Sequence, residues 1–300
     1  MAFAEVDLTK DAQDDSLKVV DILLAVDSSF PFAHAFDGDQ VGLLIGDANT
    51  TVKGVLVTLD AGLGAIARAQ ELGANVIVSH HPVRFNSFGH FNVTHVANTY
   101  PERILAAALS ADIAVIAAHT NVDVAETARR YWGDKLDFEH LGPLPAVITE
   151  LGFPRAREEQ TASDPYGELW HVNNPRSLNQ LAAEVAGFTG SPVRVFGDGE
   201  TMIETIVTAT GSGGGRIPEA QVANADLIIS GEFGYHAALA AVESGLTLIE
   251  LGHDLSELPL VDFIAEAIHV RTSIADDKLH IEDRPKLWRS VSAGAKPIDD

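Results

Sequence analysis

Two stretches of this 300-residue chain repeat one order of strand-like and helix-like segments. Short runs rich in Val and Ile alternate with alanine-rich stretches, the pattern of parallel strands joined by crossover helices. The predicted strands of the two stretches are 54–59, 76–79 and 113–117 in the first half and 205–208, 227–230 and 246–251 in the second. We therefore predict an α/β fold of two related α/β domains, an internal duplication, with a cleft between them.

The domain boundaries follow from this repeat. We place the first α/β domain at 18–145 and the second at 146–285. The polar segments 1–17 and 286–300 are predicted to be flexible tails, and REEQTASDPYG at 157–167 is predicted to be an exposed loop.

Composition narrows the class of partner and of metal site. Lys and Arg number 20 against 43 Asp and Glu, a formal charge of −23 that repels phosphate backbones, so nucleic acid is not expected as a partner. The chain has no cysteine, so any metal must be held by imidazole and carboxylate. No apolar run approaches the roughly 20 residues that a membrane span needs, and the first residues do not resemble a signal peptide. We expect a cytoplasmic protein that does not enter membranes.

Histidines and acids stand at the carboxyl ends of the predicted strands, where ligands bind in open α/β sheets. The first half provides His80 and His81 after one strand and Asp123 after the next. The second half provides His253 and Glu257 after its third strand, spaced to lie on one helix face. Adjacent residues of an extended segment point to opposite sides, so the histidine pair favours two neighbouring ions over one.

These five residues are our predicted ligands for two divalent metal ions per subunit. Asp123 or Glu257 could bridge the ions, because a carboxylate has two oxygens. Mixed imidazole and carboxylate ligation favours zinc or iron, with manganese, cobalt and nickel also possible.

Further polar residues near these segments are candidates for proton transfer or for orienting a ligand. His119 stands four residues before Asp123 and could bind metal or orient a ligand. Glu232 and His236 share the same spacing and could position substrate or move protons. The glycine-rich segment 211–215 is a weak phosphate-binding signal, and the aromatic loop 84–92 could stack a flat ring or pack against a neighbouring subunit.

The ordered motifs SHHP at 79–82, HTNVD at 119–123, SGEFGYH at 230–236 and GHDLSE at 252–257 resemble those of the Nif-three-like family. Bacterial members of that family are labelled GTP cyclohydrolase 1 type 2 homologues or dinuclear metal centre hexameric proteins. The resemblance covers about 18–283 and carries the family's metal ligands onto the same five residues. The segment FDGDQVGLLIGD at 36–47 is similar to the family's WDNVGL motif but has Gly38 at the tryptophan position and Gln40 at the asparagine position.

What the resemblance implies is a toroidal homohexamer whose sites face an internal cavity. It also implies a metal-dependent hydrolase of a small molecule, a nucleotide or related heterocycle, in a GTP cyclohydrolase 1 type 2-like reaction. The alternative is a non-catalytic metal-binding protein that regulates or binds partners. Purely structural ions are disfavoured, because three histidines and two carboxylates leave coordination positions open.

Overall fold

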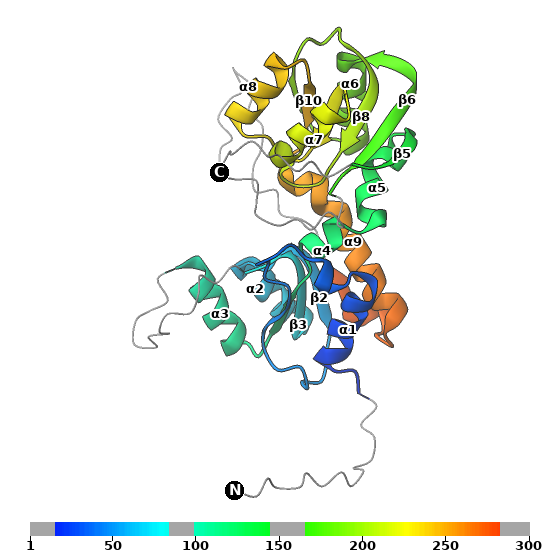
Figure 1. Cartoon of the computed structure of the whole chain (residues 1–300). Coiled ribbons are helices and arrows are strands. Elements are labelled where there is room, and N and C mark those ends of the chain that lie inside the picture. The colour runs from blue at the N-terminus through cyan, green and yellow to red at the C-terminus, as the bar shows by residue number, and fades with distance from the viewer. Residues whose placement is uncertain (1–15, 84–98, 145–165, 283–300) are drawn as a thin grey trace, which may run out of the picture.

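The computed structural model describes residues 16–83, 99–144 and 166–282. Within these ranges the chain forms two β-sheets with helices on their faces, one in each half of the molecule (Figure 1). This confirms the predicted fold class. The tails and the loops predicted at 84–92 and 157–167 fall wholly or almost wholly outside the described residues.

The first sheet has the strand order β1-β4-β3-β2-β11. Its strands are β1 (Gly42–Ile45), β2 (Val55–Asp60), β3 (Val76–His81), β4 (Ala114–Ala117) and β11 (Leu279–Ile281). The helices of this half are α1 (Val19–Ser29), α2 (Leu63–Leu72), α3 (Tyr100–Ser110) and α4 (Thr120–Asp123). A short 3-10 helix, η1 (Phe32–His34), follows α1.

The second sheet has the order β5-β6-β8-β9-β10-β7. Its strands are β5 (Glu139–Pro143), β6 (Glu168–Ser177), β7 (Arg194–Phe196), β8 (Met202–Thr208), β9 (Leu227–Ser230) and β10 (Thr247–Glu250). The remaining helices are α5 (Glu126–Lys135), α6 (Leu178–Thr189), α7 (Ile217–Val222), α8 (Tyr235–Glu243) and α9 (His253–Arg271), with the 3-10 helices η2 (Gly213–Arg216) and η3 (Asp276–Lys278).

The two sheets share a common plan. Strands β2, β3 and β4 are parallel neighbours, and so are β8, β9 and β10. In each half a preceding strand, β1 or β7, pairs antiparallel with the third of these strands. All six predicted strands are present, with ends that differ by no more than three residues. Since order and direction both repeat, the chain is internally duplicated.

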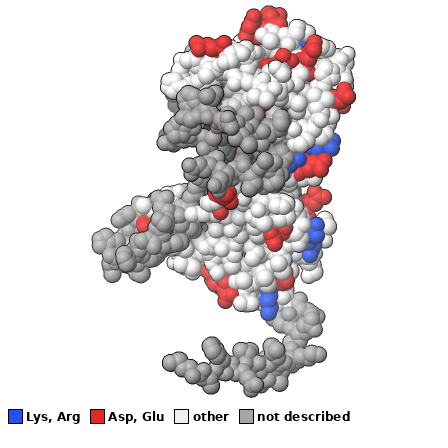
Figure 2. All heavy atoms as spheres, in the orientation of Figure 1, with Lys and Arg blue, Asp and Glu red and all other residues white. Residues whose placement is uncertain are grey.

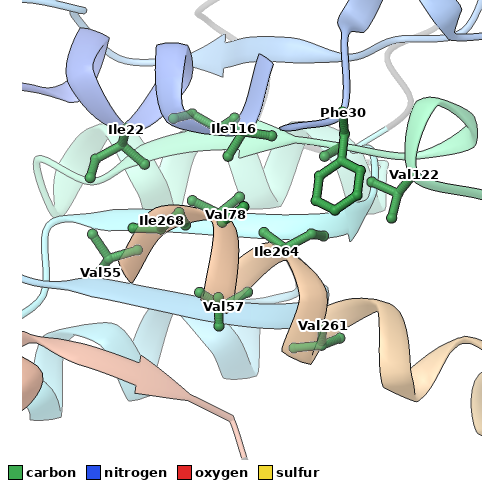
Figure 3. Packing of buried hydrophobic residues seen from close by; sticks show 14 of the residues in the cluster. Ile22, Phe30, Val55, Val57, Val78, Ile116, Val122, Val261, Ile264 and Ile268 are labelled. Carbon is green, nitrogen blue, oxygen red and sulfur yellow. The ribbon is translucent and has the colours of Figure 1, made fainter. Parts of the chain in front are cut away.

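Helix α9 connects the two halves (Figure 1). It begins directly after β10 of the second sheet, and most of its length packs against the first sheet. Its residues Ile264 and Ile268 pack with Val57 and Val78 of the central strands (Figure 3). Strand β11 then joins the first sheet beside β2. The ranges 18–145 and 146–285 stay a prediction, and the sheets place β5 with the second half and β11 with the first.

Central strands are buried over nearly their whole length because helices cover both faces of each sheet. This explains why their sequences are continuous apolar runs and lack polar alternation. In β2 and β3 the carboxylate of Asp60 and the imidazoles of His80 and His81 stand at the carboxyl ends. No helix among the described residues is long and apolar enough to cross a membrane. Acidic side chains are scattered over the visible surface, with few basic ones (Figure 2).

Candidate metal centre

The carboxyl ends of the parallel strands of both sheets meet where α9 begins, and the predicted ligands lie there. His80 and His81 end β3, and Asp123 ends the short helix α4 that follows β4. His253 and Glu257 lie in the first turns of α9. The ring centroids of His80 and His81 are 5.1 Å apart, and those of His81 and His253 are 5.4 Å apart. The structure therefore brings all five residues together.

Three groups of side chains in this cluster offer ligand atoms within 4.8 Å of one another. One group is His80, Asp123 and Glu257, and a second is His81, His253 and Glu257. The third consists of the three first-half histidines His80, His81 and His119. The rings of the adjacent residues His80 and His81 thus lie close together, although adjacent residues of a strand were expected to point to opposite sides. Each of these groups could hold a metal ion.

The carboxylate of Glu257 belongs to two of the groups. Its Oε2 lies 2.8 Å from His81 Nε2 and 3.1 Å from His253 Nε2. Its Oε1 lies 3.8 Å from His80 Nε2. Glu257 is almost completely buried, so its charge is balanced by these rings and not by water.

The surroundings of the His80 ring fit a cation best. It is fully buried, and its Nδ1 donates to the backbone carbonyl oxygen of Ala118 at 2.9 Å. Its Nε2 has no hydrogen-bond partner, although Asp123 Oδ2 lies 3.6 Å away and Glu257 Oε1 3.8 Å away. A buried nitrogen that faces two carboxylate oxygens beyond hydrogen-bonding distance is costly unless a cation lies between them. The donor set therefore fits a divalent metal ion.

Acidic side chains orient the other three rings from behind. The Nδ1 atoms of His81, His119 and His253 each donate to a carboxylate. Their acceptors are Asp60 at 2.9 Å, Asp39 at 2.8 Å and Glu232 at 3.0 Å, in that order. Such contacts set the ring orientation and direct Nε2 toward the centre, as in many metal sites.

Two of these acids escaped the sequence analysis. Asp60 is the last residue of β2 and Asp39 lies in the segment 36–47. Asp39 also accepts a hydrogen bond of 2.6 Å from the hydroxyl of Thr120, which ties that segment to α4. Asp60 could have been found by extending the rule of strand ends to β2.

The second half also supports Asp123 and Glu257 directly. The hydroxyl of Thr210, two residues after β8, donates to Asp123 Oδ1 at 2.5 Å. Gly211 follows with a positive φ of +55°, and a methyl group there would overlap Glu257 Oε1. Its backbone N–H donates to Ser256 Oγ at 2.9 Å. The start of the glycine-rich segment thus packs against the cluster, which accounts for Gly211 without a phosphate ligand.

Protonated imidazoles balance the negative charge of the buried carboxylates when no metal is bound. Burial disfavours the charged form of His81, but hydrogen bonds to Asp60 and Glu257 outweigh it and raise the pKa to about 10. The hydrogen bond to Glu257 raises the pKa of His253 to about 9. Burial alone would raise the pKa of Glu257, yet hydrogen bonds from the imidazoles hold it well below its usual range. Burial raises the pKa of Asp123.

The predicted proton-transfer residues lie at different distances from the centre. His119 is inside it, with its ring centroid 5.3 Å from that of His80. Glu232 is about half exposed and contacts the centre through His253. His236 is exposed on α8 and belongs to none of the three groups among the described residues that could hold a metal ion. The catalytic roles of these three stay predictions.

Comparisons with known proteins identify the family. The model of the Duf34/NIF3 (NGG1p interacting factor 3) family matches residues 17–282. The chain belongs to this family. The match confirms the resemblance drawn from the four motifs, and it covers nearly the whole of both halves.

Relatives within the Duf34/NIF3 family are similar over most of their length. A GTP cyclohydrolase 1 type 2 homolog of Streptomyces coelicolor is 27% identical over 244 residues, which cover 81% of this chain and 82% of the relative. One from Clostridium acetobutylicum is 27% identical over 252 residues, 82% and 87% of the two chains. The crystal structure of a hypothetical protein of Staphylococcus aureus has a TM-score of 0.76 at 26% identity, covering 92% of this chain and all of that one.

Proposed function

We propose that this Duf34/NIF3 chain is a dinuclear metal-dependent hydrolase whose metal ligands are His80, His81, Asp123, His253 and Glu257. The observation that carries the proposal is the buried Nε2 of His80, which faces two carboxylates and has no hydrogen-bond partner. The relatives' shared name, GTP cyclohydrolase 1 type 2 homolog, supports hydrolysis of a nucleotide or heterocycle.

Two ions can be assigned to two of the side-chain groups. His80, Asp123 and Glu257 would hold one ion, and His81, His253 and Glu257 would hold the other. Glu257 would then be the shared ligand, which its two oxygens allow. The ligand types favour zinc or iron over manganese, cobalt and nickel. Two such ions would supply Lewis acidity, which activates water and polarises the group under attack.

The chain's own residues prepare the site for this chemistry. Asp60 and Glu232 hold the rings of His81 and His253 so that Nε2 of each points to Glu257. The hydrogen bond from His119 to Asp39 uses Nδ1, so the other ring nitrogen, Nε2, can exchange a proton. His119 is the best placed of the three candidate proton-transfer residues, because it lies within the cluster.

Assembly and location complete the proposal. The family resemblance supports a toroidal homohexamer, and the composition supports a cytoplasmic protein that takes a small molecule and binds neither nucleic acid nor membrane. The alternative, a non-catalytic metal-binding regulatory protein, would contain the same ions without turnover.

The test is metal content per chain, measured by elemental mass spectrometry on protein purified without chelators or an affinity tag. We expect about two ions per chain and hydrolysis of at least one compound in a screen of GTP, other nucleotides and heterocycles. His81→Ala should lower the metal content below two, whereas His269→Ala, an exposed histidine far along α9, should not. Two ions without turnover would support the regulatory alternative, and no metal after reloading would overturn the proposal.

A further inference from the structure

A cavity of about 510 Å³ opens beside the candidate metal centre. Its described walls come from the ends of β2 and β3, from α2, α3 and α9, and from Glu282 after β11. Two residues, Asp60 and His81, belong both to the cavity wall and to the cluster. A molecule in this cavity would therefore reach the candidate metal centre on its His81 side.

The wall of the cavity is mostly apolar. Five aliphatic side chains and the ring of one tyrosine line the cavity. They are Leu59, Val83, Ile104, Leu258, Val261 and Tyr100. The volume is within the range of roughly 300–1,000 Å³ that holds small organic ligands. A ring system with one or two substituents fits such a space.

The charged groups on the wall are mostly acidic. They are the carboxylates of Asp60, Asp254 and Glu282 and the imidazole of His81, which is paired with Asp60 and Glu257, and the described lining contains no Lys or Arg. Glu282 is fixed by a hydrogen bond of 2.5 Å from the hydroxyl of Thr58. The net charge of the chain, −23, adds to this negative field. A phosphate in the cavity would meet three carboxylates, and the imidazole of His81 is already paired with Asp60 and Glu257.

We propose that this cavity is the substrate subsite, and that it binds a small molecule with a flat or aliphatic apolar body and a neutral or cationic amino or amidine group. The apolar body lies against Ile104, Leu258 and Val261, and the donor group faces Asp60 and Glu282. Phosphate groups lie outside the cavity. The claim that the bound molecule is a substrate rests on the proposed function. The claim that it binds in the cavity does not.

The test uses benzamidine, a flat apolar ring with a cationic amidine, and benzenesulfonate, a ring of similar size with an anionic group. Titration calorimetry on the purified full chain should give binding of benzamidine at least about tenfold tighter than that of benzenesulfonate, because the carboxylates attract one and repel the other. The preference for benzamidine should persist after the metal content has been measured and lowered with a chelator, because it depends on the carboxylates of the cavity wall.

Two variants locate the binding. Gly64 lies on the cavity wall in α2, and a Cβ there meets no atom within 4 Å, so Gly64→Phe should fill the space and abolish benzamidine binding. Gly187→Phe is the matched control, since Gly187 is also an exposed helical glycine with open space, on α6 of the second half. Glu282→Gln should weaken benzamidine binding about threefold or more without filling the cavity.

Any of three results would overturn the inference. The first is equal or tighter binding of benzenesulfonate, and the second is displacement of benzamidine by GTP at lower concentration than by a neutral aromatic amine. The third is benzamidine binding that Gly64→Phe leaves intact. Binding as expected in a chain that never holds metal would leave the inference standing and overturn the proposed function, so the two failures are distinguishable.

Discussion

Gly211 offers the sharpest test of how the second half positions the candidate ligands. Its φ of +55° is in the left-handed region, and an added Cβ would overlap Glu257 Oε1 and lie 3.5 Å from His253 Cε1. Gly211→Ala should therefore cost about 1–2 kcal/mol of folding stability from backbone strain alone. In addition, it must push the carboxylate of Glu257 away from the imidazoles.

We expect this displacement to weaken metal binding by at least about tenfold, or about 1.4 kcal/mol, because even outer contacts of metal ligands contribute that much. The assay is titration of the chelator-treated chain with zinc and, separately, thermal unfolding with and without metal. Gly215→Ala is the matched control, because it lies in the same glycine-rich segment with no atom within 4 Å of its Cβ and no positive φ. If Gly211→Ala keeps the affinity of Gly215→Ala, the argument that close packing positions Glu257 is refuted.

Three further outcomes are expected. Ile264→Ala should lower the free energy of unfolding by about 2–5 kcal/mol in urea titrations, because this fully buried side chain of α9 fills the core against the first sheet. Zinc binding at pH 7.5 should release at least about two protons per chain, since the metal-free rings of His81 and His253 have pKa values of about 10 and about 9 and must lose their protons to bind. Burial lowers the pKa of His80, but Asp123 and Glu257 outweigh it and raise that pKa as well, which can add to the release. Calorimetry in buffers of different ionisation enthalpy measures the proton release, and the apparent zinc affinity should rise with pH up to about 9–10. Thr210→Val should reduce metal affinity about tenfold with little change in fold, because it removes the hydrogen bond to Asp123, and zinc titration of the apo-protein checks it.

The sequence predicted the parts of the fold that are strongly patterned. Buried parallel strands need apolar residues on both faces, so the six central strands were visible as continuous runs of Val, Ile and Leu. The short edge strand β7 and the three-residue β11 carry no such pattern, and nothing in the sequence predicted them. The return of α9 to the first sheet was also not predictable, because it depends on which apolar face packs against which.

The candidate site followed the same division. The candidate ligand residues could be predicted because polar side chains at the ends of buried strands are conspicuous in the sequence. The groups that orient them were not found, since Asp39, Asp60 and Thr210 have no distinctive sequence spacing from the residues they contact, which are His119, His81 and Asp123. Only the geometry shows which acid meets which ring.

Duplication explains why the cluster has the composition it does. The third strand of each half leads into a helix with an imidazole and a carboxylate four residues apart, His119 and Asp123 after β4 and His253 and Glu257 after β10. In both copies an acid accepts a hydrogen bond from Nδ1 of the imidazole. One ancestral arrangement, used twice, thus accounts for four of the six central side chains.

The second strand of each half shows how the copies diverged. Strand β3 ends with His80 and His81, and at the corresponding positions directly after β9 the chain has Gly231 and Glu232. A Cβ at Gly231 would lie 2.5 Å from both the hydroxyl of Ser256 and the carbonyl oxygen of Gly211, so no side chain fits where the first copy has its buried histidine. The close approach of α9 occupies that space. The second copy therefore offers an orienting acid where the first offers candidate ligands. The candidate metal centre lies at the carboxyl ends of the strands of the first sheet and is completed by α9, which begins after the second sheet.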